Sequence, residues 1–282
     1  MSAANGLRGE AGVPILRRYA LRFDATARLL ARPRRGRGIG WTADWRRLGI
    51  LGLIAVISFL LCMVFVDAAA TRSVLTLPRA IPWFFNQITD FGKSGTVLWP
   101  LGVLLVLLTA LPQRGLAHIA RSVLAAITVR AGFLFLAVGV PGLFVAVAKR
   151  LIGRARPMVT GDVNPYAFDP FNWSAAWASL PSGHTTTVFS VLIAFGSLWP
   201  RARALLWIYA LAIAASRVAV TAHFPSDVLA GAVVGSAGAL MVRRYFALRR
   251  LVFTIGPGGE VLTMPGPSLR RIKSVARDLL AS

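Results

Sequence analysis

The sequence predicts an all-α, polytopic membrane protein with six transmembrane helices and basic cytoplasmic tails. Of its 282 residues, 56% are hydrophobic and only 15% are charged, whereas about 25% is usual in soluble domains. A globule of this size cannot hide so much apolar surface. The apolar residues gather in six runs, and most of the 32 Lys and Arg, which oppose only 10 Asp and Glu, fall outside them.

The six runs approach or reach the length that crosses about 30 Å of hydrocarbon at about 1.5 Å per residue. They cover 48–66, 96–112, 131–148, 185–199, 204–222 and 228–242. The fourth gains length if it starts at Ser182, and the fifth contains one charge, Arg217. In the sixth, Gly231 and Gly235 form a small-xxx-small pair that suits close helix packing. The aromatic-rich segment 67–95, between the first two runs, favours an interfacial position.

The two ends of the chain differ from this central part. Residues 1–47 carry eleven Arg and no uninterrupted apolar segment, which predicts a basic cytoplasmic arm rather than a cleaved export signal. Residues 48–242 form the predicted six-helix membrane domain. The tail, 243–282, is basic again, with a predicted hairpin around 256–259 and an amphipathic helix from Ser268 that suits a membrane surface or a site on the protein itself.

The distribution of basic residues predicts the orientation. With six spans both tails lie on one side, and 24 of the 32 Lys and Arg fall on that side. The positive-inside rule places this side in the cytoplasm, and in a bacterium the membrane is then the inner membrane. Cations in tails and short loops do not form the basic face that nucleic acid requires, so we expect no nucleic-acid partner. The single Cys62 can form no intramolecular disulfide.

Three polar clusters lie near the outer ends of the spans, at 149–157, 181–184 and 216–227. The chain makes no crossing between the first and second and two between the second and third, so all three face the same side. Five of the eight cations on that side stand in or beside these clusters, where topology does not account for them. They are Lys149, Arg150, Arg154, Arg156 and Arg217.

The clusters suit the binding of a phosphate. Lys149, Arg156 and Arg217 supply cations, two of them guanidinium groups that match phosphate oxygens in pairs. Ser182 and Gly183, at the start of a helix, offer free amides and a positive dipole end.

The same clusters hold groups that suit phosphoryl transfer. His223 and Asp227 are four residues apart, close enough for the carboxylate to hold the imidazole in one tautomer, as in a catalytic triad with a histidine nucleophile. His184 is then available as a general acid for the leaving group. Asp227 is the one carboxylate among the motif positions, so they contain no cluster of oxygen ligands for Mg²⁺.

Each feature alone also has a structural interpretation. Lys149 and Arg156 suit snorkelling at a helix end, and Pro-Ser-Gly is a common turn and helix cap. Arg217 is different, because a charge within an apolar run indicates function by default. The three clusters together, in order and on one face, favour a functional site.

The pattern K-x6-R-P, then P-S-G-H, then S-R-x5-H-x3-D resembles the signature of the type 2 phosphatidic acid phosphatase superfamily, the lipid phosphate phosphatases. The residues that carry it are Lys149, Arg156, Pro157, Pro181, Ser182, Gly183, His184, Ser216, Arg217, His223 and Asp227. In similar proteins the second histidine is the nucleophile and the first protonates the leaving group, which implies His223 and His184. The phosphate-binding residues implied in the same way are Lys149, Arg156, Ser182, Gly183 and Arg217.

The resemblance implies a membrane-embedded phosphatase that hydrolyses a lipid phosphate or lipid pyrophosphate through a phosphohistidine on the outer face of the inner membrane. We expect membrane lipids as its surroundings, no metal and no cofactor. A lipid phosphotransferase would use the same site with a lipid hydroxyl in place of water. Vanadium-dependent haloperoxidases resemble the same signature but are soluble, and a non-enzymatic anion-binding membrane protein would not need His223. The motifs leave four substrates open, namely undecaprenyl pyrophosphate, phosphatidylglycerophosphate, phosphatidic acid and a lipid A phosphate, and they leave the oligomeric state open.

Overall fold

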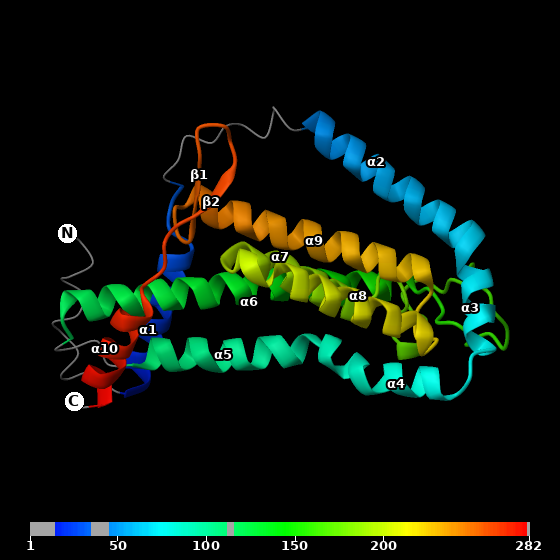
Figure 1. Ribbon diagram of the computed structural model, residues 1–282, viewed down its shortest axis with the longest axis horizontal. Helices are drawn as coiled ribbons and strands as arrows, with labels where there is room; N and C mark the ends of the chain where they lie inside the picture. The colour runs from blue at the N-terminus through cyan, green and yellow to red at the C-terminus, as the bar shows by residue number, and fades with distance from the viewer. Residues whose placement is uncertain (1–14, 35–44, 112–115, 281–282) are drawn as a thin grey trace.

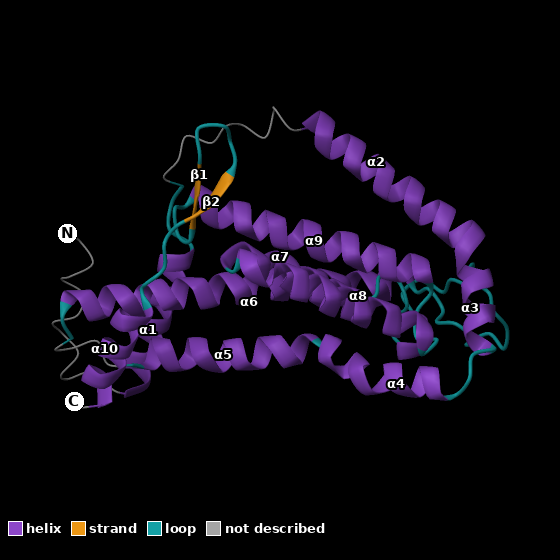
Figure 2. Ribbon diagram, viewed as in Figure 1, coloured by secondary structure: helices purple, strands orange, loops and turns teal. Residues whose placement is uncertain are grey.

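The computed structural model describes residues 15–34, 45–111 and 116–280. This part of the chain is helical apart from loops and one hairpin (Figure 2). The helices are α1 (Ile15–Leu30), α2 (Trp45–Leu61), α3 (Asp67–Leu75), α4 (Ala80–Thr89), α5 (Ser94–Ala110), α6 (His118–Ile152), α7 (Gly183–Leu198), α8 (Arg203–Ala219), α9 (Pro225–Leu248) and α10 (Leu269–Leu280). A π-helical turn (Cys62–Val66) joins α2 to α3, and strands β1 (Phe253–Ile255) and β2 (Val261–Thr263) pair antiparallel.

Five described helical stretches are long and apolar enough to cross a membrane. They are Arg46–Leu75, Ala80–Ala110, His118–Ile152, Pro200–Ala219 and Pro225–Leu248. The apolar α7 has only 16 residues, and it lies against α6, α8 and α9 in the middle of the bundle. The prediction of an all-α, polytopic membrane protein is confirmed, and a sixth crossing by α7 stays a prediction.

Two helices differ from the predicted apolar runs at their ends. α6 begins at His118, well before position 131. The added turns bury Ala120, Val123 and Leu124 against α5 and α10, and Nη2 of Arg130 donates to the carbonyls of Met264 and Pro265, both at 3.0 Å. α8 ends at Ala219 rather than at 222, where the chain turns toward α9.

The segment 67–95, which the sequence placed at the membrane interface, is helical. It forms α3, α4 and a 3-10 turn (Asp90–Gly92), and α4 continues through this turn into α5 as one apolar stretch. Figure 1 places α3 and α4 at the end of the bundle where α6 ends and α7 begins.

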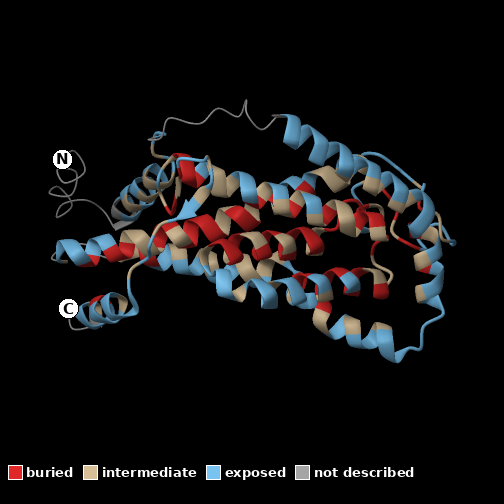
Figure 3. Ribbon diagram, turned by 45° about the horizontal axis from the view of Figure 1, so that its top comes forward, coloured by how far each residue is buried: buried red, intermediate tan, exposed pale blue. Residues whose placement is uncertain are grey.

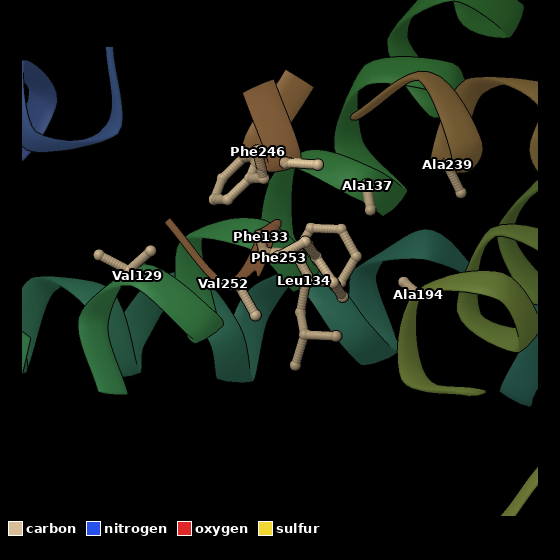
Figure 4. Close-up of a cluster of buried hydrophobic side chains, with 10 residues drawn as sticks. Val129, Phe133, Leu134, Ala137, Ala194, Ala239, Phe246, Val252 and Phe253 are labelled. Atoms are coloured by element: carbon tan, nitrogen blue, oxygen red, sulfur yellow. The ribbon is translucent and has the colours of Figure 1, made fainter. Parts of the chain in front are cut away.

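The predicted hairpin and tail helix are both present at the opposite end. The hairpin packs on the bundle through Phe253 (Figure 4). The ring centroid of Phe253 lies 4.8 Å from that of Phe133 on α6, which lies 5.4 Å from that of Phe246 on α9. α10 buries Val275 against α5 and α6, so its apolar face packs on the protein itself. Of the arm 1–47, α1 and the start of α2 are described, whereas 1–14 and 35–44 lie outside the described residues.

Burial divides the bundle into an inner and an outer set of helices (Figure 3). The buried positions concentrate on α6, α7 and the facing sides of α8 and α9, whereas α2 exposes apolar side chains along its whole length. A helix that is apolar all round suits contact with lipid. The inner helices bring their ends together where the three polar clusters lie.

Candidate active site

The end of α6 positions the first cluster. Gly153 ends the helix in the left-handed conformation (φ 60°), and its amide donates to the carbonyl of Lys149 at 3.2 Å. A Cβ here would lie 1.7 Å from the carbonyl oxygen of Asp169, so only glycine fits. The chain reverses at this turn, and half-buried Arg156 then lies close enough to Asp227 of α9 and to Lys149 for electrostatic interaction.

The start of α7 carries the second cluster. Ser182 is the N-cap, and the first amides after it have no partner within the helix, so they offer donors and a positive dipole end. The amide of Ser182 donates to the carbonyl of Asp227 at 3.0 Å, which ties α7 to α9. A Cβ on Gly183 would meet nothing within 4 Å, so the space beside these amides is open.

Two glycines of α9 let α7 approach its backbone. A Cβ at Gly231 would lie 2.5 Å from the carbonyl oxygen of Ser182, and one at Gly235 would lie 2.3 Å from that of Thr186. The predicted small-xxx-small contact is confirmed. It holds the second cluster against the helix that begins with the third.

The end of α8 carries Arg217, which is 7% exposed. Its Nη1 donates to Oγ1 of Thr89 on α4, and Ser216 donates to the same oxygen at 3.0 Å. The amides of Ala222 and His223 both donate hydrogen bonds to the carbonyl of Arg217, at 3.1 and 3.2 Å. This turn places His223 just before the start of α9.

His223 is buried, with 3% of its surface exposed. Its Nδ1 lies 3.8 Å from Oδ2 of Asp227 and 3.4 Å from Oγ of Ser179. Ser179 donates to that Oδ2 at 2.6 Å, and the amide of Phe224 also donates to it at 2.9 Å. Burial is the largest influence on the imidazole and lowers the pKa of His223 below its ordinary value, while Asp227 opposes part of this shift.

Several cationic and imidazole side chains lie near one another at this end of the bundle. Arg217 is close enough to Arg156, and His184 to both Arg217 and His223, for electrostatic interaction. Nε of Arg156, Nε of Arg217 and Nε2 of His184 are buried and have no hydrogen-bond partner among the described residues. Buried polar atoms without partners are rare, and oxygens of an anion would satisfy the arginine donors.

Comparisons with known proteins show the family of this chain. The family model described as PAP2 superfamily matches residues 130–251. A lipid A 1-phosphatase of Rhizobium johnstonii is 34% identical over 227 residues, which cover 76% of this chain and 91% of the relative. The chain belongs to the PAP2 superfamily. A lipid A 1-phosphatase of Rhizobium etli is 35% identical, over 73% of this chain and 88% of the relative.

Two solved structures were also matched. LpxE of Aquifex aeolicus has a TM-score of 0.46 at 23% identity, over 64% of this chain and 95% of that one. A transmembrane PAP2 type phosphatidylglycerolphosphate phosphatase of Bacillus subtilis has a TM-score of 0.45 at 18% identity, over 68% and 94%.

In this PAP2 superfamily member, the sequence did not predict the buried polar residues that hydrogen-bond to the motif residues or to one another. They are Asp67, Thr89, Arg154, Ser179 and Ser226, and all are buried. Two of them had a signal in the sequence. Arg154 is an outer cation that topology does not explain, and Asp67 is a carboxylate directly after the first apolar run.

Two cavities of about 410 Å³ each flank the site. One borders the turn at Thr221 and is also lined by Arg79, Trp83 and Asn86. The other is apolar and lies between α4, α5 and α8, lined by Ile88, Phe91, Thr96, Tyr209, Ala212 and Ile213. Ile213 and His184 both lie against Gly92, so the apolar cavity adjoins the second cluster.

Metal ligands do not gather in the described part of the chain. No group of three or more His, Cys, Asp or Glu side chains there has an arrangement that could hold an ion. Beside His223, Oδ2 of Asp227 accepts hydrogen bonds from Ser179 and from the amide of Phe224, and its Oδ1 accepts one from Arg154.

Proposed function

We propose that this protein is a membrane-embedded phosphatase that hydrolyses a lipid phosphate or lipid pyrophosphate through a phosphohistidine intermediate. The observation that carries the proposal is the setting of His223. Its Nδ1 faces Asp227 and Ser179, so a proton on Nδ1 leaves the lone pair on Nε2 for attack. Lowering of its pKa by burial keeps that lone pair available at neutral pH.

The reaction would proceed in two displacements. Nε2 of His223 forms a bond to phosphorus as the bond from phosphorus to the leaving oxygen breaks, and His184 gives that oxygen a proton. Water then attacks the phosphohistidine, the phosphorus–nitrogen bond breaks, and His184 takes a proton from the water. The products are the dephosphorylated lipid, or lipid monophosphate, and inorganic phosphate.

The phosphate would be held by charge and by backbone donors. Lys149, Arg156 and Arg217 would neutralise its oxygens, and the amides after Ser182 would donate to them beside Gly183. Stabilisation of this kind, by donors already in place, is commonly the largest contribution to phosphoryl transfer. No step requires a metal or a cofactor.

Among the substrates that the motifs leave open, we propose the 1-phosphate of lipid A. Two relatives that this chain matches over most of their length are named lipid A 1-phosphatases. The apolar cavity next to His184 and Gly92 supports a lipid substrate, because an acyl chain could lie there with its phosphate at the second cluster.

The proposed membrane placement has six crossings, with α7 as the shortest, within a domain at 48–242. The basic parts, 1–47 and 243–282, would lie in the cytoplasm and the site on the outer face of the inner membrane. The position of α1, α10 and the hairpin at one end of the bundle, and of the clusters at the other, supports it (Figure 1).

Phosphate release by the purified protein tests the proposal. The substrates are lipid A 1-phosphate, undecaprenyl pyrophosphate, phosphatidylglycerophosphate and phosphatidic acid, each assayed in EDTA. We expect release from lipid A 1-phosphate by the wild type and by His118→Ala, an exposed histidine far from the site, and none by His223→Ala. Release that requires added Mg²⁺ would contradict the metal-free mechanism, and full activity of His223→Ala would contradict the nucleophile.

A further inference from the structure

Asp67 stands where the first apolar helix meets α3, and its carboxylate is fully buried. It accepts hydrogen bonds from the amide of Ser226 at 2.8 Å, from Oγ of Ser226 at 2.6 Å and from Nη2 of Arg154 at 2.7 Å. Ser226 immediately precedes Asp227. Asp67 therefore joins the start of α3 to the first turn of α9, which contains Asp227.

Arg154 uses every donor that its guanidinium has. Nη1 donates to Asp227 Oδ1 at 2.6 Å and to Ser226 Oγ at 2.7 Å. Nη2 donates to Asp67 Oδ2 at 2.7 Å and to the carbonyl of Pro165 at 2.8 Å, to which Nε also donates at 3.0 Å. A guanidinium has five N–H groups, so none is left for a substrate. In this it differs from Arg156, whose Nε has no partner among the described residues.

The three charged groups form a trio with one net negative charge. Arg154, Asp67 and Asp227 all have fully buried side chains. Arg154 compensates one carboxylate, and the remaining charge extends to Oδ2 of Asp227, the oxygen nearest to His223. Without Arg154, two buried carboxylates would face each other and could not both stay ionised at low cost. Without Asp67, Arg154 would neutralise Asp227 alone.

We propose that Arg154 and Asp67 are positioning residues that set the charge and direction of Asp227, and through it the orientation of His223. This role rests on the proposed function of His223 as nucleophile. Neither residue touches the phosphate, so their loss lowers kcat and leaves KM nearly unchanged.

The net charge of the trio predicts that a second substitution restores activity lost in the first. Arg154→Gln leaves two carboxylates without a cation and should lower kcat on the order of 10²-fold, because displaced catalytic groups lose about this much. Arg154→Gln combined with Asp67→Asn restores one net negative charge on Asp227. We expect the double variant to recover at least about tenfold in kcat over Arg154→Gln, an order-of-magnitude figure for restored orientation. Residues that act only on folding would change Tm and leave the kcat of the folded enzyme unchanged in both the single and the double variant.

The test measures kcat and KM for phosphate release from lipid A 1-phosphate and from nitrophenyl phosphate. The controls are Arg72→Gln and Asp162→Asn, both exposed, which should behave as wild type. If Arg154→Gln does not fold, Asp67→Asn and Arg154→Lys carry the test, each with a lower kcat at constant KM. An unchanged kcat in Asp67→Asn, or a double variant that recovers nothing, overturns the positioning role. A wild type that releases no phosphate from any substrate overturns the proposed function first, and the positioning role falls with it.

Discussion

Nδ1 of His223 lies 3.8 Å from Oδ2 of Asp227, too far for a direct hydrogen bond, and the hydroxyl of Ser179 contacts both atoms, at 3.4 Å from Nδ1 and 2.6 Å from Oδ2. The spacing in the sequence predicted that the two residues lie together, and Ser179, from the loop before α7, also links them. Asp227 caps the start of α9 through the amide of Phe224. The carboxylate therefore caps a helix in addition to the role proposed for it beside His223.

This link predicts the effect of Ser179→Ala. Loss of a hydrogen bond to a charged group costs about 1.5–3 kcal/mol, so we expect kcat to fall by about 10–100-fold with little change in KM. The measurement is steady-state phosphate release, beside Ser174→Ala as an exposed serine of the same loop. Equal activity of the two variants would show that Ser179 does not orient the histidine.

The two histidines should separate by their dependence on the leaving group. His223→Ala should be inactive on every phosphate ester, because it lacks the nucleophile. His184→Ala should lose about 10²–10⁴-fold on esters of aliphatic alcohols, whose alkoxides need a proton, and much less on nitrophenyl phosphate. The rates are measured in single turnovers, so that they report the chemical step and not product release. Equal losses of His184→Ala on both substrates would remove its assignment as the acid.

The acidity of His223 sets the pH dependence. Burial lowers its pKa, so the unprotonated, nucleophilic form persists below the ordinary histidine value of about 6.5. The substrate phosphate also ionises, near pH about 6, and this contribution must first be removed from the pH profile of kcat/KM. We then expect the acid limb of the profile to have an apparent pKa below the ordinary histidine value. A limb at or above the ordinary value would mean that the imidazole is exposed to water or more strongly paired with Asp227.

The contact between α7 and α9 can be tested with one methyl group. In Gly235→Ala the new Cβ would lie 2.3 Å from the carbonyl oxygen of Thr186, so the helices must separate, at a cost of about 1–3 kcal/mol. We expect a lower Tm and lower kcat/KM, because Ser182 and His184 move with α7. Gly142→Ala, where a Cβ meets nothing within 4 Å, should keep both. Unchanged kcat/KM in Gly235→Ala would show that the site tolerates displacement of α7.

The proposed orientation can be tested with two exposed aspartates at opposite ends of the bundle. In a Cys62→Ala background, Asp162→Cys should react with an impermeant thiol reagent in spheroplasts. Asp278→Cys on α10 should react only after the membrane is permeabilised. The reverse pattern would place the site in the cytoplasm.

The sequence predicted the features that depend on residues near one another along the chain. Runs of apolar residues indicate helices because a helix closes its own hydrogen bonds, and five of the expected spans coincide with long apolar helices. The start of α7 after Ser182 and the hairpin near Gly258 follow from local capping and turn preferences. Helix ends were predicted less well. The early turns of α6 pack on α5 and α10, and Arg130 bonds the distant tail, and neither contact can be read from the local sequence.

The sequence by itself determined the membrane class and the family signature, because apolar runs and motif order are properties of the chain. It also singled out Lys149, Arg156, Arg217, His184 and His223 as the candidate site. Only the tertiary structure decided which buried groups bond to one another around these residues. Asp67 and Asp227 are 160 positions apart, yet one guanidinium, that of Arg154, bonds both. No spacing rule predicts such a contact, because it depends on how a helix break, a glycine turn and a helix cap meet in space. Burial makes this contact important for stability, since charges excluded from water must find partners within the fold.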